Sequence, residues 1–208
     1  MSVQIQKPKL LIVEGIDEQF CLEAALRDHL ALPDIQVIPI GGKTLLTRNL
    51  AGLITDPNFA TVRSLAVIRD ADETAPGASM PSAAQAFQSV CGSLRHVNLS
   101  CPAAHGQFAH GPPRVGVFIV PNGTDDGMLE TLCLDSVSTL PEFPCVEAYF
   151  QCLRSHQVAP KSLHKARTHA WLASRPEPDR RVGEAAQAGY WPWDSQAFDD
   201  LWVFLRSM

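Results

Sequence analysis

Short apolar runs alternate with amphipathic stretches along the first two thirds of the chain. The runs have the uniform apolar character of strands covered on both faces, and they span residues 9–13, 35–40, 64–70 and 115–120. Apolar residues at helical spacing follow the first, second and fourth runs. Because parallel strands need crossover connections, this alternation predicts an α/β fold: a mostly parallel sheet of about four strands flanked by helices.

The pattern changes at Pro141. Beyond this residue apolar positions recur at helical spacing and no strand pattern follows. The helices predicted there span residues 146–153, 162–173 and 195–205. We therefore expect residues 1–140 to form the α/β core and residues 141–208 to form a C-terminal helical extension packed on that core. The Trp191-Pro192-Trp193 segment is predicted to join the extension to the sheet.

The composition narrows the class of protein. The chain has 208 residues, of which 46% are hydrophobic, and this excludes an intrinsically disordered protein. No apolar run approaches the roughly 20 residues of a membrane-spanning helix, and the N-terminus lacks a signal-peptide pattern. We expect a soluble, cytoplasmic protein with no membrane partner. Since Cys21 and Cys133 lie at apolar helix positions, we expect most of the six cysteines to be reduced core residues.

Charge is unevenly distributed along the chain. The formal net charge of -5 argues against a generic polyanion-binding protein. Residues 115–153 contain six acidic and no basic residues, whereas residues 154–181 contain seven Lys and Arg residues. A basic helical segment beside an acidic site would suit nucleic acid as substrate. The alternative is that the basic residues simply form a solvated helix face.

Acidic residues follow three of the predicted strands. Glu14 follows the first strand, Asp70 and Asp72 close the third, and Asp126 and Glu130 follow the fourth. Ligand-binding loops gather at the carboxyl ends of parallel strands, so we expect these side chains to meet there. Carboxylate oxygens without Cys or His favour Mg²⁺ or Mn²⁺ over zinc. The alternative is that they are solvated loop residues and helix N-caps.

Three basic residues are candidates for contacts with phosphate. Lys43 follows a Gly41-Gly42 turn at the start of a predicted helix, where backbone amides and the ammonium group would bind a substrate phosphate. A tight turn with a solvated lysine is the alternative. Lys165 is expected to be catalytic, by stabilising charge on the reacting phosphate, and Arg167 to bind substrate. The Gly-Gly-Lys-Thr sequence lacks the earlier glycine of a Walker A loop, which excludes hydrolysis of nucleoside triphosphates through it.

Two motifs resemble the Toprim domain, which is shared by topoisomerases, bacterial primases and the OLD nucleases. LIVEGID at residues 11–17 and IRDAD at residues 68–72 match a glutamate after the first strand and an Asp-x-Asp pair after a later strand. The resemblance covers roughly residues 9–137. It implies that Glu14, Asp70 and Asp72 bind a divalent metal.

The chain as a whole also resembles a small, uncharacterised bacterial Toprim-like family, distantly similar to the Toprim part of OLD-family nucleases. The motifs that carry this resemblance are GGK at residues 41–43, GMLE at residues 127–130, GEAA at residues 183–186 and Tyr190-Trp191. This resemblance implies a fold and no established activity.

The combined interpretation is a divalent-metal-dependent, nuclease-like protein that cleaves phosphodiester bonds in nucleic acid. Glu14 is expected to act as general base or ligand, Asp70 and Asp72 to bind Mg²⁺ or Mn²⁺, and Asp126 or Glu130 to complete a second metal site. One alternative is a non-catalytic regulatory or binding module that works with a separately encoded ATPase; the net acidity, the missing ATPase motif and an exposed Trp-Pro-Trp segment suggest it. Another is a small-molecule phosphotransferase or phosphatase, and a homo-oligomer is left open.

Overall fold

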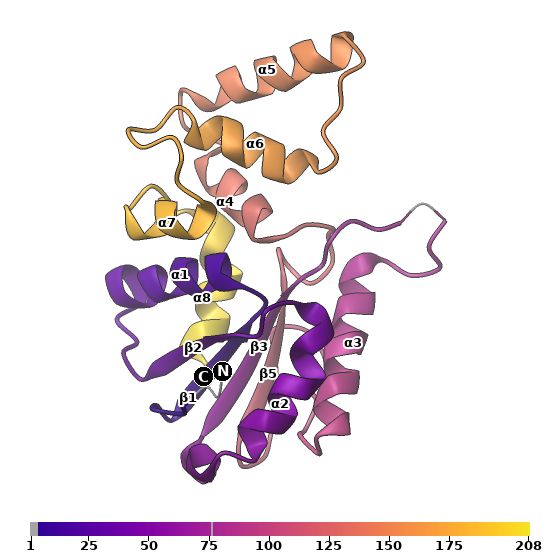
Figure 1. The fold of residues 1–208 in the computed structure, drawn as a ribbon, viewed down its shortest axis with the longest axis vertical. Helices are drawn as coiled ribbons and strands as arrows, with labels where there is room; N and C mark the ends of the chain where they lie inside the picture. The colour runs from indigo at the N-terminus through magenta and orange to yellow at the C-terminus, as the bar shows by residue number, and fades with distance from the viewer. Residues whose placement is uncertain (1–3, 76) are drawn as a thin grey trace.

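A single mixed sheet forms the centre of the computed structural model, which describes residues 4–75 and 77–208. The strands are ordered β2-β1-β3-β5-β4 (Figure 1). They span β1 (Lys9–Val13), β2 (Ile35–Pro39), β3 (Ser64–Asp70), β4 (Phe108–Ala109) and β5 (Arg114–Val120). β1, β2, β3 and β5 pair in parallel and β4 runs antiparallel to β5, so the expected mostly parallel α/β sheet is confirmed.

Helices connect the strands and continue beyond β5. They span α1 (Ile16–Ala25), the π-helical turn η1 (Leu26–Leu30), η2 (Lys43–Leu45), α2 (Leu46–Ile54), η3 (Pro57–Thr61), α3 (Ser82–His96), α4 (Leu129–Val137), α5 (Phe143–Ser155), α6 (Leu163–Leu172), α7 (Val182–Gln187), η4 (Gln196–Phe198) and α8 (Asp199–Arg206). In the described ranges, no helix combines the length and the apolar character needed to cross a membrane.

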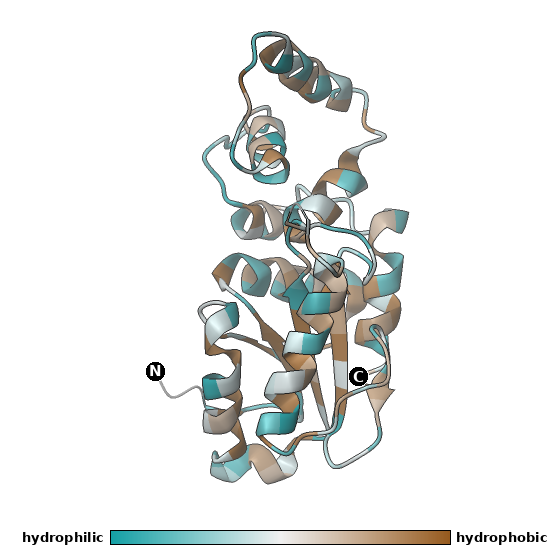
Figure 2. Ribbon diagram, turned by 90° about the vertical axis from the view of Figure 1, so that its right-hand side faces the viewer, coloured by the Kyte–Doolittle hydropathy of each residue, from teal (hydrophilic) through white to brown (hydrophobic). Residues whose placement is uncertain are grey.

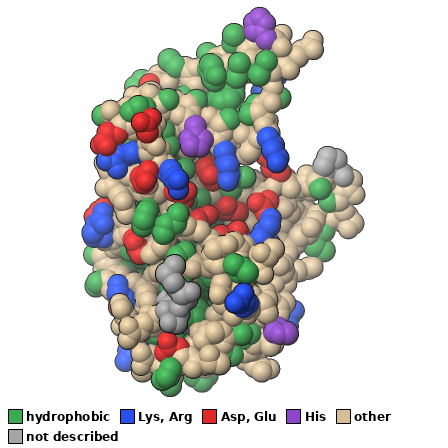
Figure 3. All heavy atoms as spheres, in the orientation of Figure 1, with side chains coloured by type: hydrophobic (Ala, Val, Ile, Leu, Met, Phe, Trp, Pro, Cys, Tyr) green, Lys and Arg blue, Asp and Glu red, His purple; other side chains and the backbone are tan. Residues whose placement is uncertain are grey.

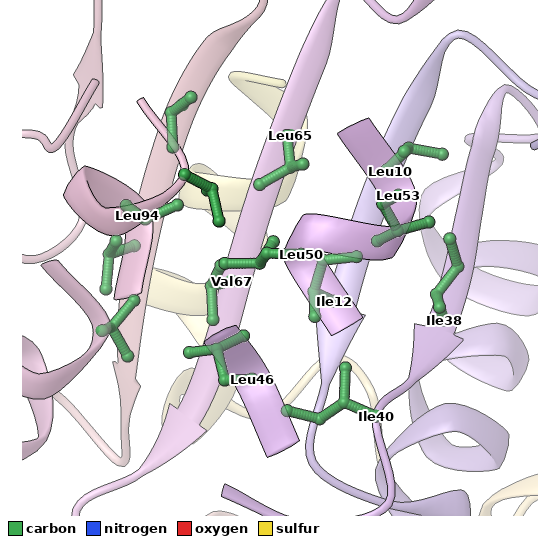
Figure 4. Close-up of a cluster of buried hydrophobic side chains, with 14 of the residues drawn as sticks. Leu10, Ile12, Ile38, Ile40, Leu46, Leu50, Leu53, Leu65, Val67 and Leu94 are labelled. Carbon is green, nitrogen blue, oxygen red and sulfur yellow. The ribbon is translucent and has the colours of Figure 1, made fainter. Parts of the chain in front are cut away.

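Helices α2 and α3 cover one face of the sheet. Leu46, Leu50 and Leu53 recur at helical spacing on α2 and are buried, as is Leu94 on α3. They pack against strand side chains that include Leu10, Ile12, Ile38, Leu65 and Val67 (Figure 4). Because successive strand residues point to opposite faces, Leu11 and Val13 of β1 belong to the cluster on the other face.

Helices α1 and α8 cover that second face. Phe198, Leu201, Trp202 and Leu205 form the apolar side of the C-terminal segment and are all buried. In Figure 2 the strands are hydrophobic along their length, as expected for a sheet enclosed from both sides.

Helices α4 to α7 form a third apolar cluster beyond the carboxyl ends of the strands (Figure 1). Trp171 of α6 stacks on Trp191, with ring centroids 4.8 Å apart. Trp191 is fully buried, so the expectation that this segment is exposed is wrong for this residue. Trp193 lies against Phe198 and Trp202, and the segment therefore joins the helices to the sheet.

Four elements are absent from the sequence prediction: the helices α3 and α7, the 3₁₀ helix η3 and the strand β4. β4 is only two residues long, too short to show strand periodicity. Its Phe108 ring fills the space that a side chain at Gly116 would occupy, since a Cβ there would lie 2.6 Å from the ring. The strand is thus set by a tertiary contact.

The cysteines also differ from expectation. Cys21 and Cys133 are buried and reduced, as predicted. Cys91 and Cys101, however, form a disulfide between α3 and the loop before β4, with Cα atoms 5.4 Å apart. Two more cysteines, on α5, are exposed. The prediction that most of the six are reduced core residues is therefore wrong.

Candidate active site

Five carboxylates gather where the parallel strands end, and we call them the carboxylate site. Glu14 follows β1 and Asp70 ends β3, with Asp72 two residues later. Glu18 lies in the first turn of α1 and Glu130 in the first turn of α4. Figure 3 shows acidic side chains concentrated at the centre of the face drawn, with basic side chains around them.

Asp70 is at the centre of this site. Its Oδ1 accepts a hydrogen bond of 3.0 Å from the backbone N–H of Leu129, so it satisfies a free donor at the start of α4. Burial raises the pKa of Asp70 well above its ordinary value, and the nearby charges of Glu18, Glu14, Glu130 and Asp72 raise it further. All four neighbours therefore lie close enough to repel its charge.

Asp72 departs from the geometry that the sequence suggests. An extended chain would project Asp70 and Asp72 to the same side, but Asp72 has a left-handed backbone with φ of 63°. It forms a two-residue antiparallel bridge with Gly127 through hydrogen bonds of 2.8 and 2.9 Å. Its carboxylate lies 2.6 Å from the Lys43 ammonium group. The turn thus directs Asp72 toward the Gly41-Gly42-Lys43 segment.

Glu14 is paired incompletely. Its Oε1 lies 3.6 Å from Nε of Arg69, the residue before Asp70. Both atoms are buried, and neither has a hydrogen-bond partner in the described part of the chain. Burial raises the pKa of Glu14, while the Arg69 charge opposes this shift. Such an orphaned buried oxygen is available to a ligand.

Glu18 is a site residue that the sequence analysis missed. It lies in the first turn of α1, whereas Glu14 lies in the bend before that helix, so helical spacing does not relate the two residues. Burial raises the pKa of Glu18, and Glu130 and Asp17 add repulsion. The signal that points to Glu18 is its position at the start of the helix that follows β1, at the same end of the sheet as Glu14.

Lys165 contacts the carboxylate site through Glu130. Its ammonium group is 3.7 Å from Glu130, and its side chain is 57% exposed against 18% for Glu130. The lysine therefore reaches from α6 over a carboxylate that is largely covered. Its expected contact with phosphate stays a prediction.

Two predicted site residues are not brought to the carboxylate site. Asp126 accepts hydrogen bonds from the backbone N–H and the hydroxyl of Thr74, which lower its pKa. Arg167 pairs with Glu147 of α5 and lies over the Phe143 ring, 5.9 Å from its centroid. Both residues thus stabilise contacts between segments that are distant in sequence.

The donor set fits a hard divalent cation. The five carboxylates outnumber the three cations near them, Lys43, Arg69 and Lys165, and the formal charge of the set is -2 when every group is ionised. Oxygen donors in such numbers suit Mg²⁺ or Mn²⁺. As the side chains are placed, no group of three or more His, Cys, Asp and Glu within residues 4–75 and 77–208 is arranged to hold a metal ion. Two of the carboxylates turn toward lysines instead.

Comparison with known proteins identifies a family and one similar structure. The family described as "Protein of unknown function (DUF3226)" matches residues 8–208. Among solved structures, the fold is similar to the "C-terminal region of the Burkholderia pseudomallei OLD protein", with a TM-score of 0.49 and 15% sequence identity over 98% of each chain. A search of curated proteins found no match.

Proposed function

The chain belongs to the DUF3226 family of proteins of unknown function, and we propose that it is a Toprim-like, divalent-metal-dependent enzyme that cleaves phosphodiester bonds in nucleic acid. The observation that carries this proposal is the convergence of five carboxylates from β1, α1, β3 and α4 at the carboxyl end of a parallel sheet. Acids drawn together at a cost in repulsion are a mark of functional sites.

The proposed cofactor is Mg²⁺ or Mn²⁺, held by Glu14, Asp70 and Asp72, with Glu130 and Glu18 beside them. A bound divalent cation would stabilise the charge that develops on the phosphate oxygens during cleavage. The unpaired buried Glu14 Oε1 and the all-oxygen donor set support this assignment.

The protein's own cations have a complementary role in the proposal. Lys43 and Lys165 each pair with a different acid of the site, Asp72 and Glu130. A substrate phosphate would take the place of those carboxylates as the partner of each ammonium group. The positive charge of Arg69 lies 3.6 Å from Glu14, and Glu14 would accept the proton of the attacking water. Asp126 and Arg167 are left out of this site because both have other partners.

The test uses the purified full chain with Mg²⁺ or Mn²⁺. Its substrates are labelled single-stranded and double-stranded DNA, RNA and the small diester bis(p-nitrophenyl) phosphate. We expect cleavage that depends on the metal ion. The variants Asp70→Asn and Glu14→Gln should abolish this cleavage, and the matched variant Arg167→Gln, on α6, should retain it. Cleavage that survives Asp70→Asn, or that EDTA does not stop, would refute the proposal.

A non-catalytic module that works with an ATPase partner is the second candidate. It is favoured by the lysine partners of Asp72 and Glu130, which neutralise two of the acids without any ligand. Metal binding measured by calorimetry, without turnover of any diester, would support this candidate over the enzyme. Turnover of nucleotides but not of polynucleotides would instead support a small-molecule phosphatase.

A further inference from the structure

A cleft of about 900 Å³ opens between the carboxyl end of β2, the start of α1 and α2. This volume is near the upper end of the roughly 300–1,000 Å³ typical of ligand sites. No residue of the carboxylate site lines it, so it is a separate feature of the surface.

The cleft nevertheless borders the segments that lead into the carboxylate site. Its wall includes Gly15, the residue after Glu14, and Gly41, two residues before Lys43. The backbone N–H of Gly42 donates a 2.9 Å hydrogen bond to the carbonyl oxygen of Glu14, which ties the two segments together. A chain-like ligand that leaves the carboxylate site on this side would enter the cleft.

The lining has the chemistry of a site for an amphipathic anion. Ile16 and Leu45 are large apolar side chains with 45% and 37% of their surface exposed, and both line the cleft. Exposed Arg48 lies beside them on α2, and among the described residues it has neither an ion pair nor a side-chain hydrogen bond. The one acid in the lining, Asp56, accepts a 2.8 Å hydrogen bond from the backbone of Asn58 at the start of η3. The positive charge of Arg48 is therefore free for a ligand.

The η2–α2 segment carries two basic residues, Lys43 at the carboxylate site and Arg48 in the cleft. A chain-like anion that extends from the site into the cleft would therefore meet a second positive charge. A peptide added as a strand along β2 is disfavoured, because Pro39 has no N–H to donate at this edge.

We propose that this cleft binds the strand of nucleic acid that continues from the scissile phosphodiester, with Arg48 paired to a backbone phosphate and with Ile16 and Leu45 packed against the sugars. This inference rests on the proposed function, since the carboxylate site fixes where the strand begins. It assigns a polynucleotide, and not a mononucleotide, as the ligand class.

The test measures binding of a fluorescein-labelled single-stranded oligonucleotide to the full chain by fluorescence anisotropy, with Ca²⁺ in place of Mg²⁺. We expect Arg48→Gln to raise Kd by about three- to tenfold and to reduce the salt dependence of binding by about one counterion. Leu45→Ala should raise Kd without changing the salt dependence. The matched control is Arg154→Gln, because Arg154 is an exposed arginine on α5, far from this lining.

Hydrolysis of bis(p-nitrophenyl) phosphate separates the two proposals. If the cleft is a strand site, Arg48→Gln should leave this hydrolysis unchanged and raise KM for the oligonucleotide. Arg48-dependent binding of the oligonucleotide without any hydrolysis would refute the enzyme and keep the cleft assignment. Three results would overturn the cleft assignment. The first is equal affinity of Arg48→Gln and the unaltered chain for the oligonucleotide, and the second is no oligonucleotide binding at all. The third is Arg48-dependent binding of an acidic peptide alone.

Discussion

Asp70→Asn should stabilise the metal-free protein. The substitution removes the most strongly perturbed charge of the carboxylate site and keeps a side-chain oxygen in the same place. That oxygen still accepts the N–H of Leu129, so the start of α4 remains capped. Asp70, which we propose to be essential for catalysis, would thus lower the stability of the metal-free fold.

The expected gain follows from two opposing contributions. Burying a carboxylate is unfavourable by several kcal/mol, and Asp70 also faces four other carboxylates. The hydrogen bond from Leu129 weakens from a charge-assisted bond of about 1.5–3 kcal/mol to a neutral bond of about 0.5–1.5 kcal/mol. The balance favours the variant by about 2 kcal/mol, which in a chain of this length raises Tm by about 4–8 °C.

The pH dependence gives the sign of the effect independently. Since the pKa of Asp70 is raised in the folded state, the folded protein keeps a proton that the unfolded chain loses above the ordinary value of 3.8. The contribution of the protonated Asp70 carboxyl to stability is complete below the ordinary pKa, and it is lost as pH rises through the raised pKa of the folded state. The advantage of Asp70→Asn should therefore be small near pH 4 and grow toward pH 8 in urea titrations with EDTA.

Asp126→Asn is the matched control, and we expect it to change the stability of the protein in the opposite direction. Hydrogen bonds from Thr74 lower the pKa of Asp126, so its contribution is present above the ordinary pKa and is lost as pH falls through the folded-state value. Replacing it should destabilise the protein at neutral pH. A variant Asp70→Asn that is no more stable than the unaltered chain at pH 8, or a difference that does not change with pH, would refute the reasoning.

Three further outcomes are expected. Gly183→Ala should lower the free energy of unfolding by about 1–3 kcal/mol in urea titrations, because a Cβ there would lie 2.6 Å from a carbonyl oxygen of α1; an unchanged midpoint would contradict this close approach. Lys165→Ala should lower the rate of diester cleavage at least tenfold while Arg167→Ala should not, since only Lys165 faces the carboxylate site; equal losses would argue against the assigned roles. Cys101→Ser should lower the free energy of unfolding by about 2–3 kcal/mol under non-reducing conditions, as the disulfide closes a short loop, and the difference should vanish in dithiothreitol.

The sequence predicts the parts of the site that local pattern determines. Glu14 and Asp70 were located because each ends a strand buried on both faces, and the apolar run marks the end of such a strand. The left-handed turn at Asp72 could not be read from the chain, because it depends on a bridge to Gly127. Glu18 is missed because it does not end a strand: it reaches the site from the first turn of α1.

The interaction partners of Asp126 and Arg167 explain why the sequence does not show that these two residues lie outside the carboxylate site. Thr74 binds Asp126 across 52 residues, and Glu147 pairs with Arg167 across 20. Neither separation corresponds to a helical or strand period, so no local pattern could have shown that these charges are engaged elsewhere. For the same reason the basic segment after α5 is less available to a polyanion than its composition suggests.

Helix α8 has a consequence for how the chain can be divided. The last residues return to cover the face of the sheet on which Leu11 and Val13 lie, so the segment that includes α5 and α6 is an excursion between two parts of one folding unit. A fragment that stops near residue 140 would keep α1 on that face but would expose the part that α8 covers, and would be prone to aggregate. Replacing residues 143–172 with a short linker would keep α1 and α8 on the sheet, but it would uncover Trp191, the stacking partner of Trp171, and would remove Lys165 from the carboxylate site.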